Sequence, residues 1–345
     1  MTSGVQTWDG LQGQPGYRWS MTIDDRTLAV LVAEWVGKRL ADRPAQWAGD
    51  PTIRLEPRRY GLVYPEHIRL DVAWFKDQLR TYGIELATSI AYPSEITAQQ
   101  SQVRVATARF RDADVTSVIG FFEPVYGVLF TTQATQDRYR PEWIVTGYAA
   151  NDTMVIGKLM DQMQWSQAFG IGPIGVPVEG HVHNQDDVYR WGTGRAPEDA
   201  IVAGSLCNPM WLFLIGAQLA GPNLTPETFE SGMFSWTPCC GRWQGHITLG
   251  NQAMSFGRHG ILPWVDYNAD EDITEKWWDL QTTGTDEINL TAPGVYWKLE
   301  GGRRYLPGEI ASGEPAMFVK DGAVSSIPEY PPNETPPSYP PPNRA

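Results

Sequence analysis

Cysteine is scarce in this chain of 345 residues, which contains three. Cys239 and Cys240 are neighbours, and a bridge between neighbouring residues closes a strained ring. Cys207 stands alone, and no CxxC spacing is present. The sequence therefore predicts neither a disulfide framework nor a zinc site, and we expect no bound cofactor.

Long hydrophobic runs and a positive charge balance are also missing. The longest apolar stretch, Pro209–Ala220, is well short of the ~20 residues that a bilayer span requires. The segment Asn208–Ala220 is apolar on all sides, which predicts a helix that is buried on every side. The N-terminus has no basic start followed by an apolar run, so it predicts no signal peptide. A net charge of -13 argues against nucleic acid and anionic membranes as partners, because both require a positive face.

What is present is the pattern of a parallel α/β lobe. Apolar residues make up 42% of the chain and charged residues 19%, which is typical of a globular protein, and the length suits two domains. Thr22 and Asp25 resemble a capping box at the start of a helical stripe that ends near Arg39. Helix-length segments then separate four short apolar runs, and connections of that length demand parallel strands. The predicted strands are Arg59–Val63, Ile84–Ala91, Val115–Phe122 and Trp143–Gly147.

The pattern after residue 150 is mostly helical, with very few strand signals. Met154–Phe169 and Asp186–Gly192 are predicted as helices. Thr225 followed by Pro226 favours a further helix start, because threonine caps a helix and proline suits its first position.

Two glycine-containing segments of this second half predict turns and loops. Gly170–Gly175 fits the letters of a dinucleotide-binding motif, but it leads into Val176 and Pro177 instead of a helix, so we interpret it as a loop. Gly301 and Gly302 predict the turn of a hairpin in an otherwise irregular region.

Several motifs, in this order and spacing, resemble actinobacterial members of the type I periplasmic-binding family, the branched-chain-amino-acid-binding kind that feeds ABC transporters. They are Gly16–Trp19 (GYRW), Phe110–Phe122, Tyr139–Gly147 (YRPEWIVTG), Asp161–Gly170, Ala220–Phe229, Ser255–Gly260, Glu275–Asp279 (EKWWD) and Gly301–Glu309 (GGRRYLPGE).

The resemblance implies two Rossmann-like lobes that trap a small solute between them and an ABC permease as partner. It implies no enzymatic activity, and it implies a lipoprotein outside the cytoplasm. In that family the first lobe begins with several β/α units ahead of the GYRW segment, and few residues precede it here. We therefore expect one complete parallel-sheet lobe and one incomplete lobe. The predicted division is 1–19 as N-terminal segment, 20–148 as complete lobe, 149–235 as the helical part of the other lobe, 236–323 as its irregular β-containing remainder, and 324–345 as a disordered proline-rich tail.

Candidate ligand-binding residues follow from the position rule for parallel sheets, whose ligands lie beyond the carboxyl ends of the strands. In amino-acid-binding relatives a carboxylate after the fourth strand meets the ammonium group of the ligand. This chain has Gly147 and Tyr148 at that place, and Glu123, one strand away, is the candidate substitute. The full set of candidates is Phe122, Glu123, Tyr148, Tyr64 and Tyr92.

Two other functions stay open. His181 and His183, followed closely by Asp186 and Asp187, could supply metal ligands for a hydrolase or lyase. A small-molecule sensor without a transport role is the third reading, consistent with the missing signal sequence.

Two further expectations concern surfaces. Asp266, Asn268, Asp270 and Asp272 imitate the start of a calcium loop, but the glycine and the closing glutamate of that template are absent, so we expect a solvated acidic turn. An incomplete lobe would expose apolar surface around Trp211–Ile215, which predicts a homodimer or aggregation.

Overall fold

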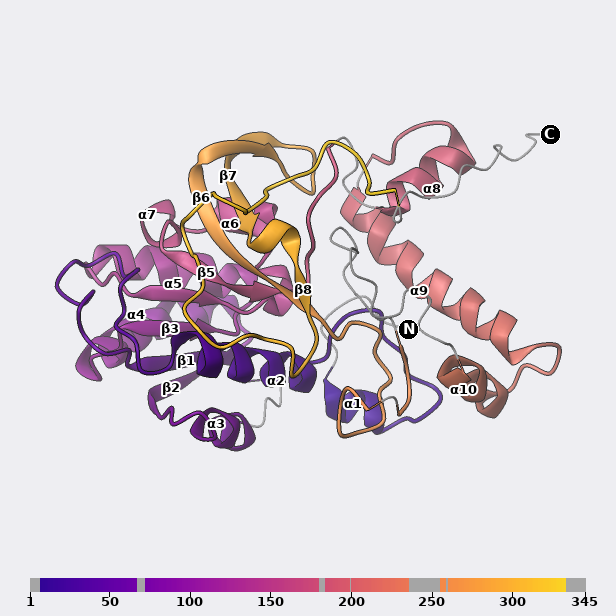
Figure 1. The fold of residues 1–345 in the computed structure, drawn as a ribbon, viewed down its shortest axis with the longest axis horizontal. Helices are drawn as coiled ribbons and strands as arrows, with labels where there is room; N and C mark the ends of the chain where they lie inside the picture. Colours follow the sequence, from indigo (N-terminus) through magenta and orange to yellow (C-terminus); the bar gives the residue numbers. More distant parts are fainter. Residues whose placement is uncertain are drawn as a thin grey trace.

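One twisted sheet with helices on both faces forms most of the molecule (Figure 1). The computed structural model describes residues 7–66, 72–179, 184–198, 200–235, 255–258 and 260–332. The strands are β1 (Tyr60–Pro65), β2 (Leu86–Tyr92), β3 (Ser117–Gly120), β4 (Glu142–Val145), β5 (Ala168–Gly172), β6 (Ile273–Thr285), β7 (Thr291–Lys298) and β8 (Arg304–Tyr305). The helices are α1 (Trp8–Gln12), α2 (Asp25–Trp35), η1 (Val36–Leu40), α3 (Val72–Arg80), α4 (Ile96–Asp112), α5 (Pro124–Gln136), η2 (Tyr148–Ala150), α6 (Met154–Leu159), α7 (Gln162–Trp165), α8 (Asn184–Thr193), α9 (Ala200–Ala220), α10 (Pro226–Ser235) and η3 (Glu300–Gly302).

The four predicted strands are confirmed as neighbours in one parallel sheet. The strand order is β2-β1-β3-β4-β5-β6-β7, and the pairs from β2 to β5 are all parallel. Val63 lies opposite Ile90 on one side and Gly120 on the other, and Gly120 in turn lies opposite Val145. The central strands are buried on both faces, which is why their sequences are short apolar runs without alternation.

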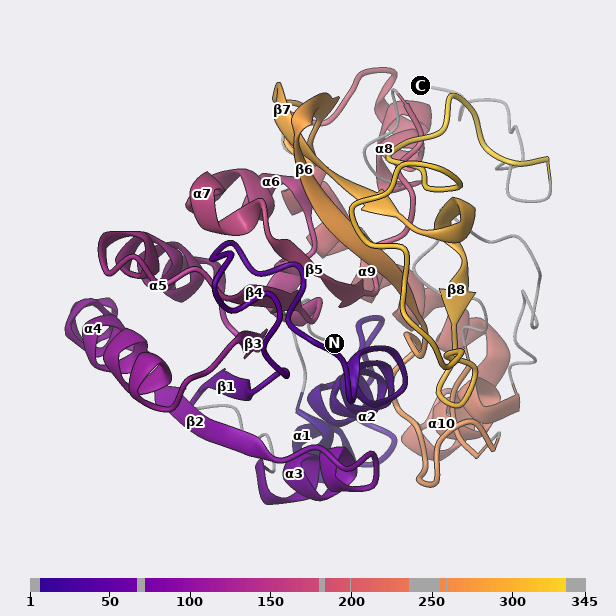
Figure 2. The ribbon, with the colours of Figure 1, turned by 60° about the vertical axis from the view of Figure 1, so that its left-hand side comes forward.

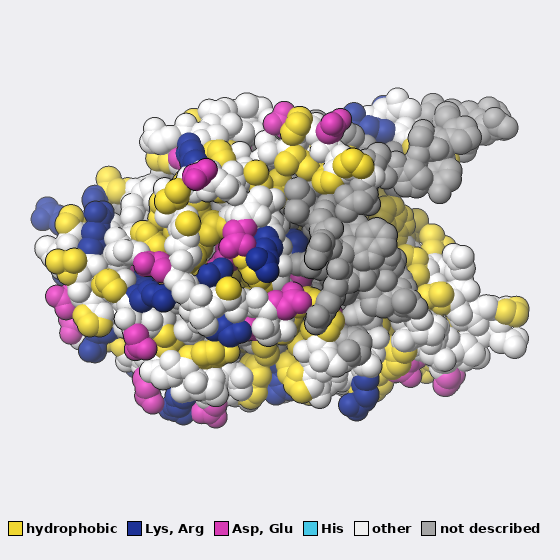
Figure 3. All heavy atoms as spheres, in the orientation of Figure 1, with side chains coloured by type: hydrophobic (Ala, Val, Ile, Leu, Met, Phe, Trp, Pro, Cys, Tyr) yellow, Lys and Arg dark blue, Asp and Glu magenta, His cyan; other side chains and the backbone are white. Residues whose placement is uncertain are grey.

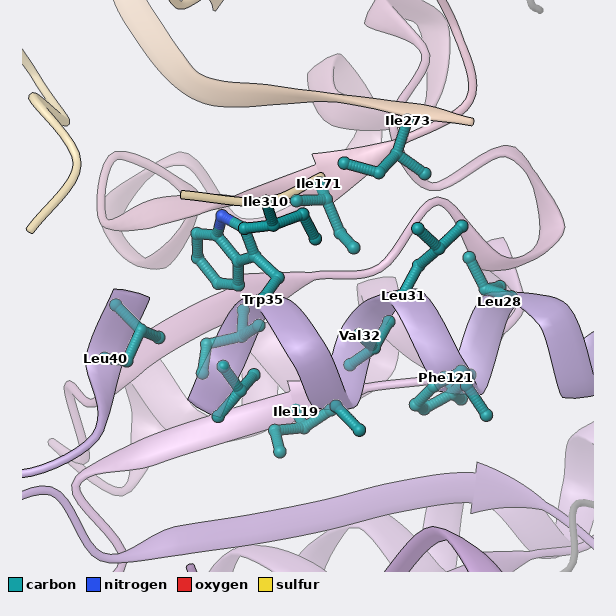
Figure 4. Close-up of a cluster of buried hydrophobic side chains, with 14 of the residues drawn as sticks. Leu28, Leu31, Val32, Trp35, Leu40, Ile119, Phe121, Ile171, Ile273 and Ile310 are labelled. Carbon is teal, nitrogen blue, oxygen red and sulfur yellow. The ribbon is translucent and has the colours of Figure 1, made fainter. Parts of the chain in front are cut away.

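Each face of the sheet is covered by its own set of helices (Figure 2). On one face α2 packs Leu28, Leu31 and Trp35 against Ile119 and Ile171 of the strands (Figure 4). On the other face, helices α4 and α5 cover a second cluster that contains Phe110, Phe130 and Trp143. The chain is therefore a doubly wound α/β protein, as the sequence predicts.

The helix α2 begins two residues after the position that the predicted capping box on Thr22 and Asp25 implies. Asp24 is its N-cap, and Oδ1 of that side chain accepts hydrogen bonds from the backbone N–H groups of Arg26 and Thr27, each at 2.9 Å. Thr22 lies outside the helix, where its backbone N–H donates to Ser20 Oγ. The predicted capping box is wrong, because the side chain of Asp24, two residues after Thr22, accepts the N–H groups of the first turn instead.

The predictions of one helix over Met154–Phe169 and of a loop over Gly170–Gly175 are both wrong in part. The helical segment breaks into α6 and α7, and Ala168–Gly172 forms β5, which is buried along its whole length. Gly170 has φ +154°, and a Cβ there would lie 2.1 Å from the carbonyl oxygen of Val145. Because the neighbouring backbone approaches so closely, this strand requires glycine and carries little of the usual β signal.

The predicted hairpin around Gly301 and Gly302 is also wrong. The hairpin joins β6 to β7 through residues 286–290, while Gly301 lies in η3 and β8 pairs with the start of β6. The strand β6 was not predicted because its sequence carries charged residues, and in the structure these charges are buried in ion pairs.

Glu275 and Lys276 on β6 point to opposite faces of the sheet. Glu275 forms a bidentate ion pair with Arg39, at 2.8 and 2.7 Å, and also accepts a hydrogen bond from the indole N–H of Trp35 at 2.7 Å. Lys276 Nζ lies 2.7 Å from Asp152 Oδ2, with both side chains fully buried. The antiparallel strand is thereby joined to the helix α2 on one face and to the loop after β4 on the other.

A smaller helical unit lies beside the sheet, formed by α1, α9 and α10 around one aromatic cluster. Trp19 stands at its centre, with ring centroids 5.7 Å from Phe229 and 5.1 Å from Tyr267. The predicted start of α10 is confirmed, since Thr225 Oγ1 accepts the backbone N–H of Thr228 in its first turn.

The prediction that Asn208–Ala220 is buried on every side is wrong. Leu212 is buried, but Phe213 is 47% and Leu214 54% exposed, and Met210 and Leu219 are exposed as well. Figure 3 shows hydrophobic side chains gathered on the side of the molecule where α9 lies. The expected exposure of apolar surface around Trp211–Ile215 is thus confirmed at Phe213 and Leu214.

The end of the described chain returns to the sheet. Val324 exchanges backbone hydrogen bonds with Lys298 of β7, and Ile327 N–H donates to the carbonyl of Pro177. The segment predicted to begin the tail at residue 324 thus still forms backbone pairs as far as Ile327, and residues 333–345 lie outside the described part. Among the helices that the structure describes, none combines the length and the apolarity that crossing a bilayer requires.

Self-association through the exposed face of α9 stays a prediction. Light scattering of the intact chain is expected to give a mass above that of a monomer, and the double substitution Phe213→Glu with Leu214→Glu is expected to lower it. The matched control is Val105→Glu, at an exposed position on α4. A monomeric parent protein would contradict the expectation.

Candidate functional site

The carboxyl ends of the parallel strands meet the N-terminus of α2 at one edge of the sheet. In Figure 4, Leu28 near the start of α2 lies on the same side as Phe121, which follows β3, and Leu40 lies at the opposite end. The helix therefore runs antiparallel to the strands, and its first residues lie at the edge where β3 and β4 end. Three segments therefore converge there: the start of α2, the turn from β3 into α5, and the loop after β4. This is the edge at which open parallel sheets bind their ligands.

The loop after β4 is held in a tight and unusual conformation. Gly147, Ala149 and Ala150 all have positive φ, at 77°, 49° and 61°. Asn151 secures the loop, because its Oδ1 accepts the N–H of Gly147 at 2.9 Å and its Nδ2 donates to the carbonyl of Gly120 at 3.1 Å. Strain of this kind at two alanines persists only where the surroundings over-determine it.

Asp152 anchors the same loop to β6 and to the segment after β5. Its Oδ2 accepts Lys276 Nζ and the backbone N–H of Ile174, at 2.7 and 3.0 Å. Lys276 also donates to the carbonyl of Ile174 at 2.8 Å. Because the group is fully buried, removal of either charge would leave the other without compensation.

Tyr148 at the centre of this loop lies among carboxylates. Burial, followed by the negative charges of Glu123 and Asp25, raises the pKa of the Tyr148 hydroxyl well above its ordinary value. Burial also raises the pKa of Tyr92, with further contributions from the charges of Glu123 and Tyr148. The structure therefore brings three of the five predicted site residues together, and it adds Asp25.

Glu123 and Tyr92 are joined by a direct contact. The backbone N–H of Glu123, at the N-cap of α5, donates to Tyr92 Oη at 2.8 Å. The Tyr92 ring in turn stacks on Tyr126, with centroids 3.9 Å apart and planes 14° from parallel. Tyr92 thus serves as a buried support for the Glu123 turn.

The other two predicted residues lie elsewhere. Phe122 is 1% exposed and packs in the cluster beneath α5, with its ring 6.2 Å from that of Trp165. Tyr64 is half-buried against the cluster on the α2 face, between Val63 and Pro65 of β1.

The acidic segment that the sequence predicts as a solvated turn is buried. Arg304 Nη2 lies 2.6 Å from Asp272 Oδ1, and burial raises the pKa of Asp270 well above its ordinary value. Asn268 donates through Nδ2 to Asp24 and to Asp266. The prediction of a solvated turn is wrong, because the sequence does not reveal that these carboxylates pair with basic and amide side chains of other segments.

This segment also runs beside the chain that enters α2. The N–H of Ser20 donates to the carbonyl of Tyr267, and the N–H of Ala269 donates to the carbonyl of Ser20, both at 3.0 Å. Burial, with the charge of Asp266 next, raises the pKa of Asp24 to about 7. The segment that enters α2 at Ser20 and the segment Tyr267–Ala269 that leads to β6 are therefore paired through their backbones.

Asp25 is the functional candidate that sequence reasoning missed. It was assigned to a helix cap, and in the structure it is 4% exposed, with its Oδ1 accepting the backbone N–H of Trp8 at 2.7 Å. Burial, opposed by that hydrogen bond and assisted by Asp24, raises the pKa of Asp25 to about 6. Its distance in sequence from the strand ends left no signal by which the position rule could have found it.

No group of three or more histidine, cysteine or acidic side chains in the described part of the chain has an arrangement that could hold a metal ion. His181 and His183 lie outside the described residues. The metal-dependent alternative thus rests on the sequence alone.

Comparison with solved structures identifies the architecture. A substrate-binding protein of an ABC transporter from Aeropyrum pernix superposes with a TM-score of 0.52 at 12% identity, covering 76% of this chain and 63% of its own. The leucine-, isoleucine-, valine-, threonine- and alanine-binding protein of Brucella ovis gives 0.50 at 11% identity, covering 88% and 68%. The chain has the type I periplasmic-binding-protein fold.

A third protein with this fold is the solute-binding protein of an ABC transporter from Rhodopseudomonas palustris BisB5, solved with 3,4-dihydroxybenzoic acid. It gives a TM-score of 0.51 at 12% identity, covering 81% of this chain and 67% of its own. This chain thus spans about two thirds of the length of these binding proteins. No family model and no curated protein matches the sequence.

The raised pKa of Asp25 predicts a pH-dependent stability. An unfolded Asp25 loses its proton near pH 4 and the folded one near pH 6, so the folded state binds more protons in between, and stability falls as pH rises from 4 to 6. Asp25→Asn should flatten this part of the profile and stabilise the protein at pH 7 by about 1 to 3 kcal/mol. Urea unfolding between pH 4 and 7 measures it.

The matched control for this substitution is Asp112→Asn, at an exposed position in α4. An Asp25→Asn variant that is less stable than the parent at pH 7, with an unchanged pH profile, would show that the Asp25 carboxylate is stabilising in the folded state.

Proposed function

We propose that this chain is the solute-binding component of an ABC-type uptake system and captures a small organic solute at the carboxyl edge of its sheet. The observation that carries the proposal is that the negative charges of Asp25 and Glu123 both act on the Tyr148 hydroxyl at that edge. These residues come from three separate segments, and open parallel sheets bind their ligands at this edge.

The chemistry of these groups favours a solute that donates hydrogen bonds. Two carboxylates accept from an ammonium, amide or hydroxyl group, and charge-assisted bonds of this kind are the strong ones. The hydroxyl of Tyr148 adds a further polar contact, and the strained loop holds it in a fixed position. An amino-acid-like compound, an amide or a small acid that also carries a donor group fits this set.

The structural neighbours support binding as the activity, because their names describe solute-binding proteins of ABC transporters. By the same analogy we propose an ABC permease as the partner and a location outside the cytoplasm, where such a protein would meet its solute. Closure of the two parts of the molecule around the solute would create the form that the permease receives.

The test is a thermal-shift screen of the intact chain with amino acids, amides and small acids, followed by calorimetric titration of each hit. A true solute raises the melting temperature. Asp25→Asn is expected to weaken its binding at least tenfold, because a hydrogen bond to a charged group is worth about 1.5 to 3 kcal/mol. Tyr148→Phe should weaken it several-fold.

Tyr17→Phe is the matched control, since Tyr17 is 69% exposed. The proposal fails if no compound of these classes binds, or if the hits bind the Asp25 and Tyr148 variants as tightly as the parent.

A further inference from the structure

Three indole rings surround one guanidinium group beside the proposed solute site. Arg26 follows Asp25 in the first turn of α2, and its guanidinium carbon lies 4.0 Å from the ring centroid of Trp8. The rings of Trp74 and Trp264 lie 5.2 and 5.5 Å from the same carbon. These rings come from α1, from α3 and from the segment before the buried acidic turn, so tertiary folding alone assembles the group.

This cluster contains an excess of hydrogen-bond donors. The recorded contacts of the Arg26 guanidinium are with ring faces, and no hydrogen bond or ion pair of this group is found within the described part of the chain. The indole N–H groups of Trp8 and Trp264 are buried, and neither has an acceptor there. Buried donors are normally satisfied, so two unpaired indole N–H groups beside a half-buried guanidinium call for an acceptor from outside the chain.

A carboxylate on a flat ring matches these donors. Arginine binds carboxylates through two parallel N–H bonds, a geometry that a planar acceptor fits best. Indole rings also pack favourably against another aromatic ring, in offset or edge-to-face contact. Trp8 and Trp264 already meet edge to face, with centroids 6.1 Å apart.

The cluster is fixed to the acidic side of the site. The backbone N–H of Trp8 donates to Asp25 Oδ1, so the indole and the carboxylate are parts of one assembly. A cationic pole at Arg26 therefore adjoins an anionic pole at Asp25 and Glu123. A solute that spans both would carry a carboxylate at one end and an N–H or O–H donor at the other.

We propose that Arg26, Trp8 and Trp264 form the anion-binding end of the solute site, and that the solute is a small aromatic carboxylate with a donor group, of the aminobenzoate type. This inference rests on the proposed function and specifies its solute class.

The experiment compares 4-aminobenzoate with 4-aminobenzamide, which has the same ring and amine without the charge, by calorimetric titration of the intact chain. The parent is expected to bind the carboxylate at least tenfold more tightly than the amide. Arg26→Met should abolish this preference. Arg26→Lys should keep only part of it, because lysine has the positive charge but lacks the two parallel N–H donors of the guanidinium. Trp8→Phe, which keeps a ring and removes the N–H, should weaken carboxylate binding several-fold.

Arg104→Met is the matched control, at an exposed position on α4, and melting curves establish that each variant is folded. The inference is overturned if the amide binds as well as the carboxylate, or if Arg26→Met leaves the preference unchanged. In either case the proposed function stands, provided that another solute binds in a manner that depends on Asp25. If no solute of any class binds, the proposed function fails as well.

Discussion

The two buried ion pairs of β6 are the constraint on which the placement of α2 and of the loop after β4 depends. Successive residues of a strand point to opposite faces, so Glu275 reaches Arg39 on η1, which continues α2, while Lys276 reaches Asp152 on the loop after β4. A buried charge is tolerated only with a partner, and both partners here come from distant segments. One antiparallel strand therefore specifies how the helix α2, the parallel sheet and the site loop are placed relative to one another.

The site depends on this arrangement more than on its own residues. Asp152 secures the loop in which Tyr148 lies, and Arg39 secures the helix whose first turn carries Asp25 and Arg26. A rigid sheet edge that presents both an acidic pole and a guanidinium among indole rings is suited to recognition of a small polar solute. Preorganisation of this kind lowers the entropy cost of binding.

The part of the fold that could be predicted from the sequence was the part governed by local pattern. Four apolar runs separated by helix-length segments identified β1 to β4, and the position rule proposed Tyr92, Glu123 and Tyr148, whose role in binding stays a prediction. β5 was missed because close backbone contact at Gly170 requires glycine, and β6 was missed because ion pairs allow its charges to be buried. Asp25 and the cluster around Arg26 depend on contacts between distant segments, which periodicity does not encode.

Amide hydrogen exchange in a Lys276→Met variant tests the central claim most directly. The account predicts faster exchange at Gly147 and Ile174, whose N–H groups bond within the assembly around Asn151 and Asp152, while Ile119 in β3 keeps its protection. Unchanged protection at Gly147 and Ile174 would contradict the account, because the ion pair would then not stabilise the loop after β4. An equal loss of protection at Ile119 would also contradict it, because the ion pair would then stabilise the whole sheet and not this loop in particular.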